Sequence, residues 1–443
     1  MSKKTKLIEL NPREKALLVV VDLFSLRSEN LKIEDEANEL RELAKTSGLG
    51  ILDEVICHYD KPSPNLFIGK GKAQELGFIV REQGIAVAVF SVDLSGTQQR
   101  NLEALIGCKT IDRTQLILDI FAQHAKSPEG KTQVELAQLE YLLPRLTGKG
   151  IMLSRLGGGI GTRGPGEQKL ELDRRRIRSR IDKLKKDLDQ IRSQRNLRQK
   201  KRKLEAVPLV ALVGYTNAGK TTLLNSLVGE HQLVDDSLFT TLDPLSRTML
   251  LPNNQKIIIA DTVGFLHNLP HRLIEAFKAT LEDVQEADLL LQVLDISHPL
   301  RYSYQQSVEV VLKELNCLGK PVITVLNKID KLDDTGWLER YKMDFPNSIA
   351  VSALRKKNLD ELIAAIAKIV SKGIKKVKIT IPIDKMGLVD LIYREGKVED
   401  IKYTSKSVII NAKIPGLTIG KMPSYVNLDS REEEGRGLKG RAG

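Results

Sequence analysis

The chain has 443 residues, of which 41% are hydrophobic and 28% are charged, and its formal net charge is +12. This length allows about three domains, and the composition is that of a globular protein rather than a fibrous or wholly disordered one. No apolar stretch approaches the roughly 18 residues of a membrane helix, and the N-terminal ten residues lack the apolar core of a signal peptide. The three cysteines are widely spaced and form neither a metal motif nor a disulfide framework. We therefore expect a monomeric cytoplasmic protein that has no membrane span. Transient association with a membrane is left open.

Residues 1–125 alternate strand-like and helix-like patterns, which predicts a small N-terminal α/β domain. Apolar runs predict strands at 16–21 and 85–90. Amphipathic runs predict helices at 33–47 and 94–106. Gly69-Lys70-Gly71-Lys72 superficially resembles a phosphate loop, but a glycine-rich turn before a helix at Ala73 is the favoured interpretation. No other feature of this region identifies a nucleotide site.

Residues 126–206 predict a helical hairpin with a glycine-rich tip loop. A helix over 132–143 ends at Pro144, the glycine-rich segment covers 147–166, and a long helix runs from about 167 to 205. Apolar residues of the long helix repeat with heptad spacing, which predicts packing against a neighbouring helix; they are Ile177, Ile181, Leu184, Leu188 and Ile191. About 35 helical residues would span roughly 50 Å, so the loop would lie at the tip of a projecting arm.

The net charge is concentrated in this arm. Residues 174–203 contain 15 lysines and arginines against three aspartates, a balance of +12 that equals the charge of the whole chain. Glycines allow close backbone approach, and basic side chains neutralise phosphates. Aromatic residues are nearly absent, so we expect recognition of the backbone and shape of structured RNA rather than of single-stranded bases. The alternative is a solvated charged helix with a connector. The predicted RNA-binding residues are Lys149, Arg155, Gly157, Gly158, Gly159, Arg163, Arg174, Arg175 and Arg176.

An apolar run at 209–213, the sequence GYTNAGKT from Gly214 and a helical pattern at 221–228 predict a P-loop. In such a loop, backbone N–H groups and the start of the helix bind phosphate oxygens. Lys220 would contact the outer phosphates, and the Thr221 hydroxyl would ligate Mg²⁺. The predicted nucleotide-binding residues of the loop are Gly214, Tyr215, Thr216, Asn217, Ala218, Gly219, Lys220, Thr221 and Thr222.

The sequence DTVG begins at Asp261, directly after a strand-like run. Because α/β sheets hold ligands at the carboxyl ends of their strands, Asp261 is predicted to bind Mg²⁺ through water. The N–H group of Gly264 would sense a γ-phosphate. A switch I threonine, Thr240 or Thr241, would complete the metal site, and the pattern alone does not choose between them. The predicted nucleotide-binding residues of this motif are Asp261, Thr262, Val263 and Gly264.

The sequence NKID, which follows a strand-like run at 322–326, predicts a guanine base. The Asp330 carboxylate can accept hydrogen bonds from N1–H and the exocyclic amine of guanine, which adenine does not offer. Such discrimination is large because a wrong base leaves buried polar groups unpaired. The predicted base-side residues are Asn327, Lys328, Asp330, Ser352 and Ala353. Because these motifs occur in the order in which a GTPase uses them, we predict GTP as substrate and Mg²⁺ as cofactor, in a domain over 207–372.

The residue after DTVG is Phe265, where Ras-like GTPases carry a glutamine that orients the attacking water. Phenylalanine cannot hydrogen-bond this water, so intrinsic turnover should be slow, with the missing group supplied by RNA, a partner protein or another residue. The alternative is that Phe265 only packs in switch II, and both interpretations can hold.

Residues 373–428 predict a small C-terminal α+β domain. Strand patterns at 377–381 and 407–410 flank a short helical pattern at 387–394. The remaining residues, 429–443, are rich in Glu, Gly and Arg and are predicted to be disordered. The whole chain is thus predicted to be α/β, with a P-loop GTPase domain between an α/β domain with its helical hairpin and this C-terminal domain.

Several longer segments carry a resemblance to a known family; they are NLFIGKGKAQEL at 65–76, DRTQLILDIFAQHAKSPEGKTQVELAQLEYLLPRL at 112–146, RLGGGIGTRGPGEQKLELDRRRI at 155–177, LFTTLDP at 238–244 and DTVGF at 261–265. Over nearly its full length the chain resembles the HflX family of translational GTPases. The resemblance implies that the N-terminal region engages the large ribosomal subunit and its rRNA, with the glycine-rich loop directed toward the peptidyl-transferase region. It also implies splitting or rescue of stalled ribosomes, notably under stress, and it selects Thr241 as the switch I magnesium ligand. The C-terminal segment occurs in only some members. The predicted catalytic residues are Lys220, Thr241, Gly264 and Phe265.

Two alternatives stay open beside a ribosome-gated switch. A GTPase of large-subunit assembly would bind precursors and would not split intact ribosomes. An ATP-dependent rRNA remodelling enzyme would need a second nucleotide site, because NKID argues against ATP in the GTPase domain. No feature of the N-terminal region identifies such a site.

Overall fold

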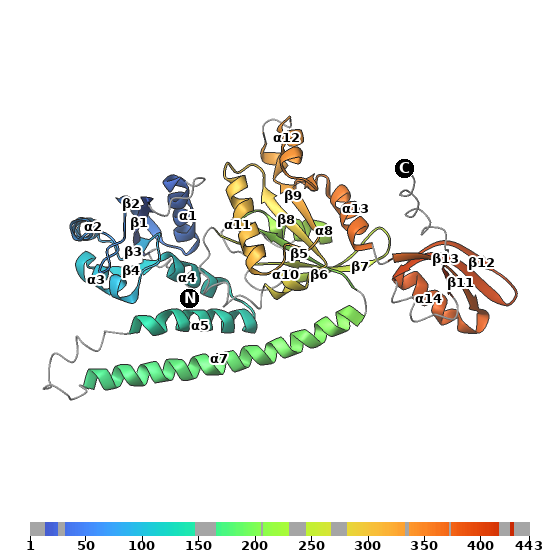
Figure 1. Cartoon of the computed structure of the whole chain (residues 1–443), viewed down its shortest axis with the longest axis horizontal. Coiled ribbons are helices and arrows are strands. Elements are labelled where there is room, and N and C mark those ends of the chain that lie inside the picture. The colour runs from blue at the N-terminus through green and yellow to red at the C-terminus, as the bar shows by residue number, and fades with distance from the viewer. Residues whose placement is uncertain are drawn as a thin grey trace, which may run out of the picture. The chain divides into compact units, whose positions relative to one another are not determined.

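The structure, a computed structural model, describes residues 14–24, 32–146, 165–204, 207–229, 245–266, 281–332, 336–371, 374–415 and 426–428. Figure 1 shows its helices and strands in chain order. The chain forms two compact units, and their boundary falls between Arg192 and Ser193. Within the described residues, no helix is both long enough and apolar enough to cross a membrane.

The N-terminal sheet has four parallel strands in the order β2-β1-β3-β4. Its strands are β1 (Lys15–Leu23), β2 (Gly50–Tyr59), β3 (Val87–Phe90) and β4 (Lys109–Asp112), and its helices are α1 (Ile33–Thr46), α2 (Lys70–Gln83), α3 (Gly96–Ile106) and α4 (Arg113–His124). The sequence pattern did not predict β2, β4 or α4, and the burial of β2 does not alternate regularly. Helix α2 begins at Lys70 rather than at Ala73, because Gly69 is its extended N-cap and Gly71 already lies in its first turn.

The predicted helical pair follows. It consists of α5 (Pro128–Leu142), the short η2 (Leu143–Leu146) and the 40-residue α7 (Pro165–Leu204). Helix α5 begins four residues before the predicted start, because Ser127 caps the N–H group of Gly130 at 2.9 Å. Leu136 of α5 packs against Ile181 and Leu184 of α7, two members of the predicted heptad seam.

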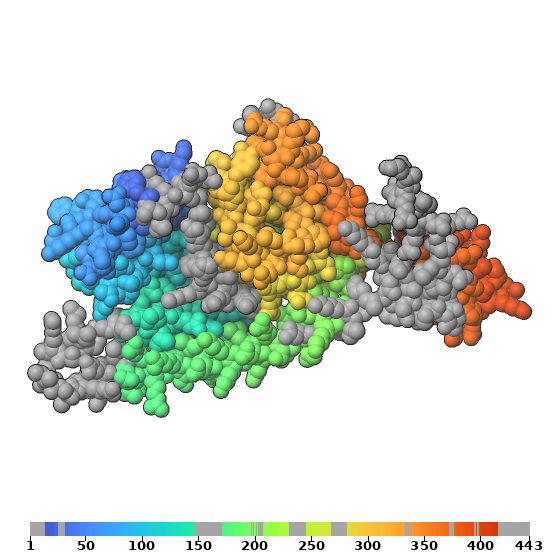
Figure 2. Space-filling model, viewed as in Figure 1, coloured from blue at the N-terminus to red at the C-terminus, as the bar shows by residue number. Residues whose placement is uncertain are grey.

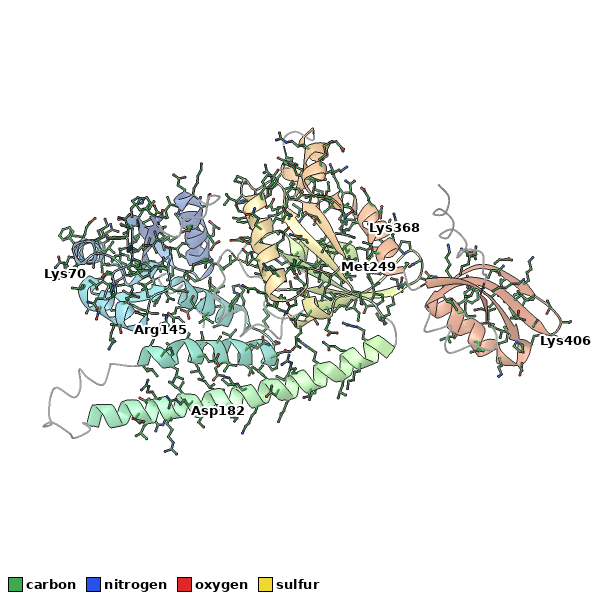
Figure 3. All side chains as sticks on the ribbon, in the orientation of Figure 1. Lys70, Arg145, Asp182, Met249, Lys368 and Lys406 are labelled. Atoms are coloured by element: carbon green, nitrogen blue, oxygen red, sulfur yellow. The ribbon has the colours of Figure 1, made fainter. Side chains whose placement is uncertain are left out.

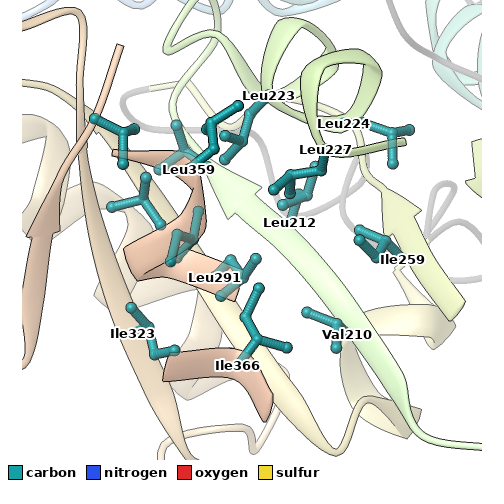
Figure 4. Packing of buried hydrophobic residues seen from close by; sticks show 14 of the residues in the cluster. Val210, Leu212, Leu223, Leu224, Leu227, Ile259, Leu291, Ile323, Leu359 and Ile366 are labelled. Carbon is teal, nitrogen blue, oxygen red and sulfur yellow. The ribbon is translucent and has the colours of Figure 1, made fainter. Parts of the chain in front are cut away.

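A mixed six-stranded sheet in the order β10-β9-β8-β5-β7-β6 forms the next domain, and only β6 is antiparallel to its neighbour. The strands are β5 (Leu209–Gly214), β6 (Leu245–Leu250), β7 (Lys256–Asp261), β8 (Leu289–Asp295), β9 (Val322–Asn327) and β10 (Ser348–Ala350). The helices are α8 (Lys220–Val228), α10 (Glu282–Glu286), α11 (Arg301–Glu314), η3 (Ile329–Lys331), α12 (Trp337–Asp344) and α13 (Leu359–Val370). Figure 4 shows its core, where Leu223 of α8 and Ile366 of α13 pack with Val210 and Leu291 of the sheet.

The C-terminal region is an antiparallel sheet in the order β12-β13-β11-β14. Its elements are β11 (Ile374–Pro382), η5 (Ile383–Lys385), α14 (Met386–Glu395), β12 (Lys397–Tyr403), β13 (Ser407–Pro415) and β14 (Val426–Leu428). Val389 and Ile392 of α14 pack into the core of this sheet. The predicted disorder of 429–443 lies outside the described residues. The predicted fold class is confirmed by these three sheets and the helical pair, whereas the predicted domain boundaries stay predictions.

Candidate nucleotide-binding site

The three principal motifs meet at one edge of the six-stranded sheet. Gly214 ends β5, Asp261 ends β7 and Asn327 ends β9. These strands run parallel through the pairs β5–β7, β5–β8 and β8–β9, so their carboxyl ends lie together. This edge is where ligands bind in open α/β sheets.

The P-loop wraps the start of α8. Gly219 has a φ of 90°, and a Cβ atom there would collide with the side-chain amide of Asn327, so the position requires glycine. The Lys220 ammonium is buried and donates hydrogen bonds to the carbonyl oxygens of Gly214 at 3.1 Å and Tyr215 at 2.8 Å. Burial lowers the pKa of Lys220 to about 8, since the neighbouring Asp261 carboxylate offsets only part of the desolvation. The ammonium is therefore held at the phosphate end of the loop.

Two oxygen donors suited to magnesium meet beside this lysine. The Thr221 hydroxyl donates to Oδ2 of Asp261 at 2.7 Å, and the Asp261 side chain is fully buried. The next residue, Thr262, donates its hydroxyl to the carbonyl oxygen of Leu212 at 2.6 Å, which fixes the turn after β7. A hydroxyl and a carboxylate are the hard oxygen ligands that Mg²⁺ takes, so these residues fit the ion. Thr240 and Thr241 lie outside the described residues.

The segment after Asp261 is held against the P-loop. The N–H group of Phe265 donates to the carbonyl oxygen of Gly214 at 3.1 Å, and the N–H group of Thr216 donates to the carbonyl oxygen of Phe265 at 2.9 Å. The Phe265 side chain is buried, as is that of Val263. A Cβ atom at Gly264 would lie 2.8 Å from Cα of Thr216. The buried side chain agrees with the interpretation that Phe265 packs in this segment. The expected slow turnover stays a prediction.

Asn327 ties the base-side loop to the P-loop. Its amide donates to the carbonyl oxygen of Ala218 at 2.9 Å and accepts from the N–H group of Ala353 at 3.1 Å. The hydroxyl of Ser352 donates to the Asp330 carboxylate, and its oxygen accepts from the N–H group of Arg355 at 3.0 Å. The predicted base-side residues, which lie in the loops after β9 and β10, are thus brought together.

Lys328 connects the P-loop to the end of β8. It adopts a left-handed φ of 66°, and its ammonium donates to the carbonyl oxygen of Asn217 at 2.7 Å. The same ammonium pairs with the Asp295 carboxylate at 2.8 Å. Asp295 belongs to none of the sequence motifs, although it ends the apolar run of β8 at the same sheet edge as Asp261. That position was the signal that could have identified it.

The candidate RNA-binding residues are described only in part. Arg175 and Arg176 are exposed on α7, and Arg174 is half-buried. Figure 2 shows side chains projecting from the coloured part of this helix. The other candidates lie outside the described residues; they are Lys149, Arg155, Gly157, Gly158, Gly159 and Arg163.

One edge of the sheet carries a P-loop, a carboxylate that fits Mg²⁺ and the NKID loop. This combination defines a P-loop GTPase. Matching family models cover most of the chain, with the descriptions GTP-binding GTPase N-terminal (34–122), GTP-binding GTPase Middle Region (124–202), 50S ribosome-binding GTPase (209–328) and HflX C-terminal domain (338–417). The chain belongs to the HflX family of GTPases.

Relatives named GTPase HflX match over similar lengths. The protein of Caldanaerobacter subterraneus subsp. tengcongensis is 44% identical over 405 residues, which are 91% of this chain and 92% of the relative. That of Lacrimispora saccharolytica is 42% identical, over 93% of this chain and 96% of the relative. That of Escherichia coli is 39% identical, over 82% of this chain and 85% of the relative. The C-terminal segment matches the HflX model, so it is part of the family resemblance here.

Proposed function

We propose that this GTPase binds the large ribosomal subunit and its rRNA, and that it splits or rescues ribosomes with GTP hydrolysis stimulated by the ribosome. The observation that carries the proposal is α7, one 40-residue helix that contains the basic run and ends in ion pairs with the GTPase domain. The family model matched at 209–328 is described as a ribosome-binding GTPase, which supports the choice of partner.

The surface of α7 suits an RNA backbone. Ile181 and Leu184 are buried, so the packed side of the helix is apolar, whereas Arg175, Arg176 and Arg178 are exposed. Two ion pairs, Arg180–Glu135 at 2.7 Å and Lys185–Glu140 at 2.8 Å, join α7 to α5. Figure 3 labels Asp182, one of only three acidic residues between 174 and 203, on the exposed side of α7. RNA phosphates that bind along this helix would release their counterions, so binding should depend strongly on salt concentration.

The last part of α7 is attached to α10. Arg195 lies 3.8 Å from the Glu282 carboxylate, and Arg202 lies 3.9 Å from the Glu286 carboxylate. Arg202 also donates to the carbonyl oxygen of Glu286 at 3.4 Å. Both arginine side chains are largely buried. Because α10 leads directly into β8, whose end carries Asp295, this contact is a route by which ribosome binding on the arm would act on the nucleotide site.

The chemistry follows from the site. The P-loop N–H groups and Lys220 would hold the phosphates of GTP, and the Asp330 carboxylate would accept hydrogen bonds from guanine. Thr221, Asp261 and Thr241 would hold Mg²⁺, which when bound neutralises charge on the β- and γ-phosphates. Since the buried Phe265 cannot orient water, the ribosome would supply or position the missing group, which couples turnover to binding.

The test compares GTP hydrolysis by the full chain alone, with purified large subunits and with intact ribosomes, and follows splitting by light scattering. We expect stimulation by both ribosomal preparations and dissociation of intact ribosomes. Replacing residues 157–166 by a short linker should preserve GTP binding and abolish stimulation. If the protein bound only large-subunit precursors and left intact ribosomes whole, the assembly alternative would replace this proposal.

A charge-matched pair of variants separates the basic helix from general electrostatics. Neutralising three residues of α7 should weaken ribosome binding and reduce the slope of log affinity against log salt by up to about three. The same charge loss at exposed lysines of the GTPase domain should leave the slope near that of the wild type. Equal effects of the two triple variants would contradict a specific role for α7. The variants are Arg174→Gln, Arg175→Gln and Arg176→Gln, against Lys313→Gln, Lys342→Gln and Lys368→Gln.

A further inference from the structure

An aromatic stack lies directly against the P-loop. The ring of Tyr215, the second residue of GYTNAGKT, is parallel to the ring of Tyr304 in α11, with a centroid distance of 3.8 Å and an interplanar angle of 7°. The ring of His298 stacks on Tyr304 at 4.7 Å, and its Nε2 lies 3.5 Å from the Tyr304 hydroxyl. Neither Tyr304 nor His298 belongs to a nucleotide-binding motif.

The backbone around Tyr215 is where the P-loop meets switch II. The carbonyl oxygen of Tyr215 accepts from the Lys220 ammonium at 2.8 Å. The groups on either side of Tyr215, the carbonyl of Gly214 and the N–H of Thr216, both bond to the backbone of Phe265. A movement of Tyr215 would therefore displace the lysine that meets the phosphates and the anchor of the segment that contains the γ-phosphate sensor.

The stack packs against the residue that such a movement would displace. Tyr215 is buried, so its ring is held by what packs on it rather than by solvent. Parallel aromatic pairs stabilise beyond their buried area, so a displacement of Tyr215 that separates the two rings costs free energy. Removing Tyr304 would leave space beside Tyr215, and neighbouring groups fill such space only in part.

The support of the stack also reaches the base side of the site. Asp295, three residues before His298, pairs with Lys328 at 2.8 Å and accepts from the N–H group of Ser297 at 3.0 Å. Asp295, the last residue of β8, thus contacts Lys328. In the connection from β8 to α11, His298 packs on Tyr304, whose ring stacks on Tyr215 of the P-loop.

We propose that Tyr304 is a positioning residue for GTP hydrolysis, whose ring holds Tyr215 and thereby keeps Lys220 and Phe265 in register with the phosphates. This role concerns the basal reaction of the GTPase site. It does not depend on the proposed ribosomal partner, so each proposal can fail without the other.

The test uses the full chain without ribosomes and measures single-turnover GTP hydrolysis, GDP affinity and thermal unfolding. Tyr304→Phe keeps the stacked ring and loses the hydroxyl, so its hydrolysis rate should stay within about twofold of wild type. Tyr304→Leu keeps apolar volume and loses the ring, so its rate should fall about five- to tenfold. GDP affinity should fall less than the hydrolysis rate, because the contacts of Asn327, Asp330 and Ser352 stay in place.

Tyr302 provides the matched control on the same helix. It is half-exposed, stacks on Phe345 at 5.4 Å and donates to Asp344 at 2.6 Å, away from the P-loop contacts. Tyr302→Leu should lower the unfolding temperature and preserve the hydrolysis rate. A wild-type rate in Tyr304→Leu, or an equal loss in Tyr302→Leu, would overturn the proposal.

A second variant keeps the test decisive if Tyr304→Leu does not fold. Tyr215→Leu removes the other ring of the pair, so it should show the same fall in rate. Where both single variants fold, the double variant should be no slower than either one, because only one stack is lost. Wild-type hydrolysis by Tyr215→Leu, or fully additive losses in the double variant, would refute a positioning role for the stack.

Discussion

Replacing Gly264 with alanine should slow GTP hydrolysis in a protein that still folds. An added Cβ atom would lie 2.8 Å from both Cα and Cγ2 of Thr216, and 3.1 Å from the Lys220 ammonium. Favourable contacts between carbon atoms are about 3.5–4.0 Å, so the neighbours must separate by roughly 0.7 Å or more. One of these neighbours is backbone of the P-loop, which no side-chain rotation can move aside.

The magnitude follows from that displacement. Overpacking of this kind typically costs about 1–3 kcal/mol, which is less than the roughly 5–15 kcal/mol by which a domain is typically stable. Catalysis is more sensitive, because a misplacement of about 1 Å can cost on the order of 100-fold in rate. We therefore expect the hydrolysis rate of Gly264→Ala to fall about 10- to 100-fold, with GDP affinity much less affected because the base-side loop is untouched.

The assay is single-turnover hydrolysis at saturating enzyme, with GDP affinity measured separately by fluorescence. Gly319→Ala is the matched control, since a Cβ atom there would meet nothing within 4 Å. Its rate should equal that of the wild type. Wild-type hydrolysis by Gly264→Ala would refute the idea that this close approach positions the site.

Three further predictions follow from the same structure. Asp330→Asn should weaken GTP binding about 100-fold or more, since two hydrogen bonds to a charged group each contribute roughly 1.5–3 kcal/mol. The variant should bind xanthosine triphosphate instead, which competition titrations with GTP, ATP and xanthosine triphosphate measure. Equal competition by ATP in the wild type would disprove guanine selection. Because burial lowers the pKa of Lys220 to about 8 in the free protein, the ammonium is already charged below pH 8, whereas GTP binding must take up a proton above it. Affinity should therefore fall with rising pH above about 8, by at most about tenfold per unit, and calorimetry at pH 8.5 in buffers of different ionisation enthalpy should detect proton uptake that Lys220→Met lacks. Arg202→Glu should reduce ribosome-stimulated turnover and protein stability, and the reversed pair with Glu286→Arg should restore part of both; stimulation that is undiminished in Arg202→Glu would exclude this contact as a coupling route.

The sequence determined the chemistry of the site and several of its elements. GYTNAGKT, DTVG and NKID each act through a few adjacent residues, so their identity and order already indicated a GTPase. Regular periodicity likewise predicted α7 closely. Ser127 followed by Pro128 is a local signal for the start of α5, so the predicted start at Thr132 was too late. Patterns of this kind depend on neighbours within a few residues, and such neighbours are visible in a sequence.

Only the tertiary structure decided which distant residues meet. The burial of Phe265 against the P-loop, the pairing of Lys328 with Asp295 and the stacking of Tyr215 on Tyr304 all join segments that are far apart in the chain. An aspartate or tyrosine after an apolar strand has many potential partners, and no local pattern selects among them. The order in which β5, β7, β8 and β9 pair brings these side chains to one edge of the sheet. That order results from packing both faces of the sheet at once, so it depends on the whole domain rather than on any segment alone.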